Sequence, residues 1–232
     1  MNRIIAAIFL FAQIITSANA QERGYQPGSL VTDFKLRNVD NREVSLADYG
    51  SAKGYVIVFT CNTCPYAKAY EQRIIELHNK YGTKGYPVIA INPNDPAVSP
   101  GDSFTAMKER SQSKKYPFVY LIDPDQKVTR RFGATRTPHV YVVNRTGEGN
   151  KVAYIGAIDS DTEDTDPDKV RFVENAINAL MAKKLPETKV TKAVGCTIKW
   201  KKRKRELFCF TKYLRNYESH IRFKVFGRKQ TK

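Results

Sequence analysis

Apolar runs alternate along the chain with segments of helical periodicity. Residues 55–60 and 87–91 are almost continuously apolar and β-branched, which is typical of strands covered on both faces. Between them, apolar positions recur at helical spacing over residues 67–81, and Gly82 follows. A loop rich in Asn, Asp and Pro then precedes a second predicted helix near residues 102–111. This order predicts parallel strands with helical crossovers.

The second half of the chain predicts antiparallel strands and a closing helix. Residues 118–122 read as a third strand, and residues 140–143 and 152–155 flank a turn and read as a hairpin. A last helix is expected over residues 168–184, and two short strands near residues 34–36 and 44–46 precede the core. The pattern predicts an α/β fold, a three-layer α/β/α sandwich with a mixed central sheet.

Residues 1–20 have the pattern of a signal peptide. Arg3 precedes an apolar run over residues 4–15, and small residues ending at Ala20 supply a cleavage site. The run is short for a membrane span, so we expect cleavage before Gln21, with an uncleaved anchor as the alternative. The organised domain is then expected over residues 21–200, in a periplasmic or secreted protein.

Positive charge is concentrated at the C-terminal end. The formal net charge is +16, and residues 201–232 hold twelve Lys or Arg against two Glu. This extension mixes basic and aromatic residues, so it suits weak contact with an anionic surface, or it is poorly ordered. Because export separates the chain from nucleic acid, we expect no nucleic-acid partner.

Two cysteines stand where the first buried strand meets the first helix. Cys61 and Cys64 are three residues apart, and Pro65 suits the first helical turn, where a missing N–H costs little. A thiolate at a helix N-terminus is stabilised by free N–H groups and the helix dipole. The spacing therefore predicts that Cys61 attacks a disulfide and that Cys64 resolves the mixed disulfide, with no bound cofactor.

Other readings of this pair are a zinc half-site and a static disulfide. Zinc would need a second Cys or His pair, and the three histidines are scattered singly, so we expect no metal there. Downstream, Thr137-Pro138 precedes the predicted hairpin. A cis bond at Pro138 would turn the backbone toward the cysteines and leave Thr137 exposed to pair with an extended substrate; a trans proline that starts a strand is the alternative.

These motifs resemble those of the thioredoxin superfamily, and more narrowly its peroxiredoxin-like redoxin branch. The narrower resemblance rests on residues 56–66, which contain the CxxC motif followed by proline, and on residues 192–200, which contain Cys196; it covers about residues 25–202. It implies a thioredoxin-like fold and an antioxidant or disulfide-exchange role. It also implies that Cys64 occupies the peroxidatic position of true peroxiredoxins.

The resemblance leaves three functions open. True peroxiredoxins have Thr or Ser three residues before that cysteine and Pro seven before, whereas this chain has Cys61 and Ile57. We therefore expect thiol–disulfide exchange with protein thiols, using Cys61, Cys64 and Pro138 and a partner reductant or oxidant. The alternatives are a thiol peroxidase using Cys64, and a non-catalytic exported binding module with a basic surface-binding tail.

Several further residues carry weaker signals. Cys196 is an auxiliary resolving thiol, a member of a disulfide elsewhere or an unreactive thiol, and a bridge to Cys209 has no motif behind it. The carboxylates of residues 159–168 suggest calcium, but an acidic loop leading to the N-terminus of the last helix explains them more simply. His139 is expected to be an ordinary packed or exposed residue.

Overall fold

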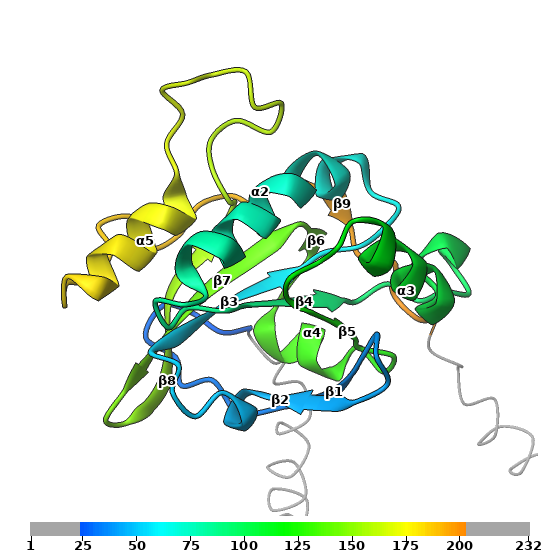
Figure 1. Ribbon diagram of the computed structural model, residues 1–232, viewed down its shortest axis with the longest axis horizontal. Coiled ribbons are helices and arrows are strands. Elements are labelled where there is room, and N and C mark those ends of the chain that lie inside the picture. Colours follow the sequence, from blue (N-terminus) through cyan, green and yellow to red (C-terminus); the bar gives the residue numbers. More distant parts are fainter. Residues whose placement is uncertain (1–23, 203–232) are drawn as a thin grey trace, which may run out of the picture. The chain divides into compact units, whose positions relative to one another are not determined.

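The structure is a computed structural model that describes residues 24–202, and its centre is a seven-stranded sheet (Figure 1). The predicted residues 1–20 and nearly all of the basic tail lie outside the described residues. The strands of this sheet are β1 (Lys35–Asn38), β2 (Glu43–Ser45), β3 (Gly54–Phe59), β4 (Val88–Asn92), β5 (Val119–Ile122), β7 (His139–Thr146) and β8 (Gly149–Gly156).

The sheet is mixed, with the order β2-β1-β5-β4-β3-β7-β8. The strands β3, β4 and β5 are parallel, whereas β7 pairs antiparallel with β3 and the edge strands add antiparallel hairpins. Every residue of β3 and β4 is buried, which explains their continuous apolar sequence. A separate two-stranded sheet joins β6 (Arg136–Thr137) to β9 (Cys196–Thr197).

Helices cover both faces of the sheet. The helices are α2 (Pro65–Tyr81), α3 (Phe104–Ser113), α4 (Lys127–Phe132) and α5 (Phe172–Met181), with short 3-10 turns at Leu46–Asp48 and Pro100–Asp102. Apolar residues of α2 and α5 pack with Val56 and Val140 on one face, and α3 packs on that face over Ala90. On the other face, Phe132 of α4 packs with Ile57 and Phe59. The predicted three-layer sandwich is confirmed.

Two features differ from the sequence-based expectation. The last helix begins at Phe172 rather than near residue 168, because residues 159–168 form a loop held by its own hydrogen bonds. The helix α4 was not predicted, since six residues give too short a pattern to read. Its N-terminus is fixed instead by Asp123, which accepts hydrogen bonds from the backbone N–H and hydroxyl of Thr129 at 2.8 and 2.6 Å.

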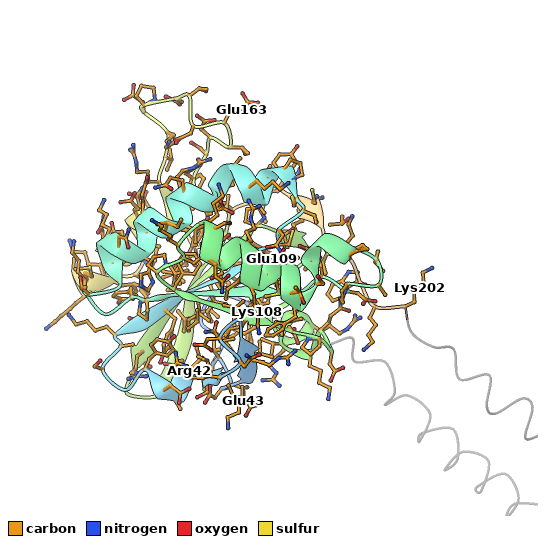
Figure 2. The ribbon with its side chains drawn as sticks, turned by 45° about the vertical axis from the view of Figure 1, so that its right-hand side comes forward. Arg42, Glu43, Lys108, Glu109, Glu163 and Lys202 are labelled. Atoms are coloured by element: carbon orange, nitrogen blue, oxygen red, sulfur yellow. The ribbon has the colours of Figure 1, made fainter. Side chains whose placement is uncertain are left out.

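The described surface mixes charges of both signs. Figure 2 shows Arg42 and Glu43 at the β1–β2 hairpin and Lys108 and Glu109 on α3 pointing outward. Within residues 24–202, no helix combines the length and apolar character that crossing a membrane requires. Of the twelve Lys or Arg residues in the basic C-terminal extension, ten lie beyond Lys202, outside the described residues.

Candidate active site

The two cysteines lie at the junction between β3 and α2. The buried strand β3 ends at Phe59, and α2 begins at Pro65 with Cys64 as its N-cap residue. Proline at this first position leaves the helix intact because its missing N–H has no partner there. The side chains of Cys61 and Cys64 are both buried, with 5% and 3% of their surface exposed, and both are free thiols. The predicted strand, cysteine pair and helix are therefore in place.

Asp102 holds the loop between the cysteines. Its fully buried carboxylate accepts hydrogen bonds from the backbone N–H of Asn62 at 2.7 Å and from the Thr63 hydroxyl at 2.8 Å. It also accepts from the Ser99 hydroxyl and the Asn94 amide. A buried carboxylate with four donors fixes the backbone around it. No local pattern marks this role, because Asp102 reads only as a residue near a helix start.

The Thr137-Pro138 segment lies directly against both sulfurs. The bond between these residues is cis. The Thr137 hydroxyl oxygen is 3.2 Å from Cys61 Sγ, and the protonated thiol of Cys64 donates to the Thr137 carbonyl at 3.1 Å. Cys61, Cys64 and Pro138, the three predicted site residues, therefore come together in one cluster, although Cys64 and Pro138 are far apart in the sequence.

The expectation of an exposed Thr137 backbone is wrong. Thr137 is fully buried, and β6 pairs antiparallel with β9 so that Thr137 lies opposite Cys196. Figure 1 shows β6 and β9 side by side near one end of α2. The edge at which an extended substrate was expected to pair is thus occupied by the chain's own C-terminal segment. The backbone N–H of Cys196 also donates to Cys64 Sγ at 3.4 Å.

The surroundings place the negative charge of the reduced pair on Cys64. The neighbouring Cys61 thiol lowers the pKa of Cys64 to about 4 against the opposing effect of burial, and the side chain and backbone N–H of Cys196 add to this lowering. The same contact with Cys64, together with burial and the nearby charge of Asp102, raises the pKa of Cys61. The sequence placed the thiolate on Cys61, whereas the contact with the Cys61 thiol and the hydrogen bond from the Cys196 N–H favour the charge on Cys64.

Cys196 is half-buried and completes a group of three thiols. It packs against Cys61 and Cys64 in one apolar cluster. Burial, together with the neighbouring Cys64 side chain and its charge, raises the pKa of Cys196 to about 11. Cys64 is therefore the most acidic of the three thiols. When it loses its proton, it gives up its hydrogen bond to the Thr137 carbonyl, while Cys61 and Cys196 remain protonated.

His139 follows Pro138 but makes no hydrogen bond to a sulfur within the described residues. Its Nδ1 accepts from the backbone N–H of Thr135 at 3.4 Å, and its ring lies 5.0 Å from that of Tyr141. Burial, with the nearby charge of Arg136, lowers the pKa of His139 to about 4. The ring is therefore neutral at neutral pH and acts as a packed side chain, as the sequence suggested.

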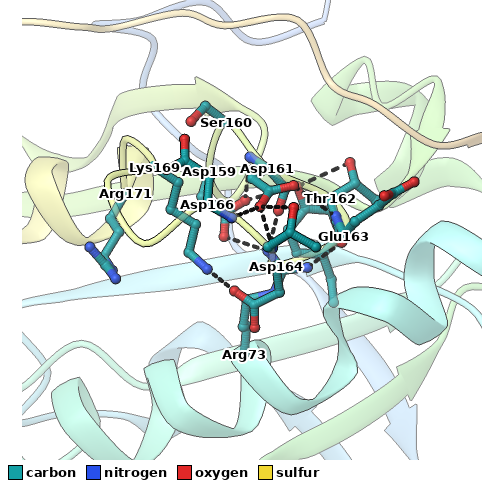
Figure 3. A network of polar contacts seen from close by, with 12 residues as sticks. Arg73, Asp159, Ser160, Asp161, Thr162, Glu163, Asp164, Asp166, Lys169 and Arg171 are labelled. Carbon is teal, nitrogen blue, oxygen red and sulfur yellow. Dashed lines mark hydrogen bonds and ion pairs between the residues drawn. The ribbon is translucent and has the colours of Figure 1, made fainter.

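The acidic loop at residues 159–168 satisfies its carboxylates internally. Figure 3 shows Arg73 of α2 reaching into the loop, where it pairs with Asp159 at 2.7 Å. Asp161 accepts from the backbone N–H groups of Thr165 and Asp166, and Asp164 pairs with Lys169. In residues 24–202, no group of three or more potential ligands is arranged to hold a metal. These carboxylates contribute to loop structure, rather than to the helix N-terminus as expected.

The sandwich fold and the buried CxxC pair define a thiol-based redox enzyme of the thioredoxin-like class. The chain belongs to the AhpC/TSA family, whose model matches residues 27–153. That span includes both cysteines of the pair and Pro138, but it ends before Cys196. The resemblance stated from the motifs is confirmed.

Two solved structures are similar over most of this chain. A conserved protein of uncharacterised function from Geobacillus kaustophilus is 35% identical, covers 76% of this chain and 93% of its own, and has a TM-score of 0.70. A hypothetical protein from Sinorhizobium meliloti 1021 is 24% identical, covers 79% and 99% of the two chains, and has a TM-score of 0.71. The second likeness concerns the fold alone. No curated protein matches the chain significantly.

Proposed function

We propose that the protein is a thiol–disulfide oxidoreductase in which Cys61 and Cys64 alternate between dithiol and disulfide. The observation that carries this proposal is the packing of the two free thiols in one buried cluster, with Thr137 in contact with both sulfurs. Two thiols in such contact close to a disulfide with little movement of the chain. The substrate is a protein disulfide or thiol, and a partner dithiol or disulfide restores the starting state. In the exported form, this exchange takes place in the periplasm or outside the cell.

The lowered pKa of Cys64 favours Cys64 as the attacking sulfur in the reducing direction. The Cys64 thiolate attacks one sulfur of a substrate disulfide, which forms a mixed disulfide and releases the other sulfur as a thiolate. Cys61 gives its proton to solvent or to that thiolate and attacks Cys64 Sγ. The Cys61–Cys64 bond forms, the mixed disulfide breaks, and the second substrate thiol leaves. These roles are the reverse of those predicted from the sequence, since the thiolate is more stable on Cys64.

Hydroperoxide reduction is a second candidate function, because the family match and the lowered pKa of Cys64 both favour it. A peroxidatic thiolate would become a sulfenic acid, which Cys61 would condense with to form the same disulfide. Among the described residues, however, no arginine or lysine side chain is hydrogen-bonded to Cys64. The contacts of Cys64 are instead sulfur and backbone groups, which support disulfide exchange.

The test compares the two oxidants on the full-length reduced protein. Samples are mixed with hydrogen peroxide or with a disulfide-bonded model protein, quenched with an alkylating agent, and mapped by mass spectrometry. We expect Cys61 and Cys64 to be oxidised rapidly by the model protein and slowly by peroxide, and Cys64→Ser to slow disulfide exchange by at least about a hundredfold. Cys209→Ser is the matched control and should leave the rate unchanged. Faster oxidation by peroxide would replace the proposal with a peroxidase.

A further inference from the structure

A segment of the chain lies where an extended substrate would pair with the active site. Residues 194–201, which we call the strap, include β9 and cross the site beside β6. Arg136 and Thr137 pair with Thr197 and Cys196 in antiparallel register. This is the arrangement in which an extended peptide adds to an exposed strand edge. The strap therefore presents Cys196 to the active site as a substrate peptide would present its own cysteine.

The strap is built to remain in this place. Ile198 is buried in the core, and its backbone N–H donates to the Thr135 carbonyl at 3.2 Å. Gln126 clamps the far end, because its side-chain amide donates to the Lys199 carbonyl at 2.9 Å and accepts from the Lys201 N–H at 2.9 Å. On the near side, the guanidinium of Arg136 donates to the Gly195 carbonyl at 2.8 Å. Contacts on both sides of Cys196 thus fix its position.

Gly195 allows the close approach that brings Cys196 to the sulfurs. A Cβ atom at this position would lie 2.2 Å from the Thr137 carbonyl oxygen and 3.0 Å from the Pro138 nitrogen. These are backbone atoms, so a larger residue would force the strap away from β6. The glycine therefore sets the distance between the strap and the CxxC pair.

We propose that Cys196 is a third redox-active thiol that exchanges with Cys64 and forms a Cys64–Cys196 disulfide. The inference rests on the proposed function and deepens it, because it gives the CxxC pair a tethered intramolecular partner. Two observations carry it: the Cys196 N–H donates to Cys64 Sγ at 3.4 Å, and the Cys196 side chain packs in one cluster with Cys61 and Cys64. Cys64 is the central sulfur, with a thiol of the same chain on each side.

The exchange is an isomerisation with no net oxidation. The Cys196 thiolate attacks Cys64 Sγ of the Cys61–Cys64 disulfide. The Cys64–Cys196 bond forms as the Cys61–Cys64 bond breaks, and Cys61 leaves as a thiolate that takes up the proton Cys196 released. Oxidation of Cys64 removes its negative charge, which is one of the causes of the raised pKa of Cys196. Cys196 therefore becomes a better nucleophile at the moment when its target is a disulfide.

The test uses full-length variants that keep two thiols each. Cys61→Ser with Cys209→Ser retains Cys64 and Cys196, and the matched control Cys61→Ser with Cys196→Ser retains Cys64 and Cys209. Both are equilibrated in an oxidising glutathione buffer and mapped by mass spectrometry of their peptides. We expect the first variant to hold the internal Cys64–Cys196 disulfide, at a level at least about tenfold above any internal disulfide in the control. Glutathione adducts or free thiols on both Cys64 and Cys196, without the internal bond, would overturn the proposal.

A separate variant distinguishes this inference from the proposed function. Cys209→Ser retains all three thiols of the cluster and should form the Cys61–Cys64 disulfide and reduce a model protein. If this variant neither forms the Cys61–Cys64 disulfide nor reduces the model protein, while the Cys64–Cys196 disulfide forms in the Cys61→Ser chain, then the proposed function fails and the Cys64–Cys196 pairing is supported. If this variant forms the Cys61–Cys64 disulfide and reduces the model protein, but the Cys64–Cys196 disulfide never forms, then only the proposed redox role of Cys196 fails.

Discussion

Thr137 and Cys196 lie opposite each other in antiparallel register, and this pairing closes the strand edge beside the CxxC pair. Thr137 contacts Cys61 through its hydroxyl and Cys64 through its carbonyl, while the backbone of Cys196 contacts Cys64 from the other side. The reactive sulfurs are thus enclosed by two short strands that are distant in sequence. A protein substrate must displace the strap or react at the surface that Cys196 leaves open, so the placement of the strap governs access to Cys64.

Substitution of Gly195 should release this strap. In Gly195→Ala, the new methyl group meets the Thr137 carbonyl, so we expect a loss of about 1–3 kcal/mol in the free energy of unfolding and faster alkylation of Cys196. Gly147→Ala is the matched control, because nothing lies within 4 Å of a Cβ atom there. Chemical denaturation and timed alkylation measure the two effects. An unchanged Cys196 alkylation rate in Gly195→Ala would contradict the role assigned to the glycine.

Removal of Cys61 should make Cys64 a weaker acid. The neighbouring Cys61 thiol is the largest cause of the lowered pKa of Cys64, so in Cys61→Ala that pKa should rise from about 4 toward the ordinary thiol value of 9.0. The pH dependence of Cys64 alkylation, followed by mass spectrometry, measures the change. Cys196→Ala is the comparison variant and should give a smaller shift, because it removes a weaker donor and leaves the Cys196 N–H in place. A larger shift in Cys196→Ala than in Cys61→Ala would refute this ranking.

The buried ion pair between Arg73 and Asp159 should be important for stability. Both side chains are less than a tenth exposed, and Asp159 also accepts from the Tyr70 hydroxyl at 3.0 Å. Asp159→Ala leaves the guanidinium buried without its counter-charge, so we expect a loss of about 3–5 kcal/mol in the free energy of unfolding. Glu43→Ala removes the exposed partner of Lys35 and should change the free energy of unfolding by less than about 1 kcal/mol. Equal losses in the two variants, measured by urea denaturation, would contradict this interpretation.

His139 should make stability depend on pH. Its pKa is about 4 in the folded protein, below the ordinary value of 6.5, so between these values the unfolded chain binds a proton that the folded chain does not. Stability from this group is therefore present above pH 6.5 and is lost as the pH falls to about 4, by about 3 kcal/mol in all.

The measurement for His139 is the free energy of unfolding as a function of pH. The difference between the original chain and His139→Gln should shift across this window and stay constant above about pH 7.5, where the histidine is neutral in both states. A difference that is constant at every pH would show that His139 does not titrate on unfolding in this way.

The sequence by itself determined the elements that build the redox centre. The helix α2 and the strands β3 and β4 could be predicted from local sequence patterns, because burial on one or two faces dictates their residue types. The CxxC motif at the end of a strand marked the candidate redox pair, and the downstream Thr137-Pro138 pair marked a segment that contacts it. Both rest on local patterns that a single sequence displays.

Only the tertiary structure decided which groups meet at the sulfurs. Asp102 lies 40 residues from Asn62, whose N–H it accepts, and Cys196 lies 132 residues from Cys64, and nothing local marks either contact. The relative acidity of the two thiols also depends on the fold, because it follows from the groups around each sulfur rather than from the order of the two cysteines. A contact between distant residues depends on how the whole chain packs, and two-residue strands such as β6 and β9 exist only because packing brings them together.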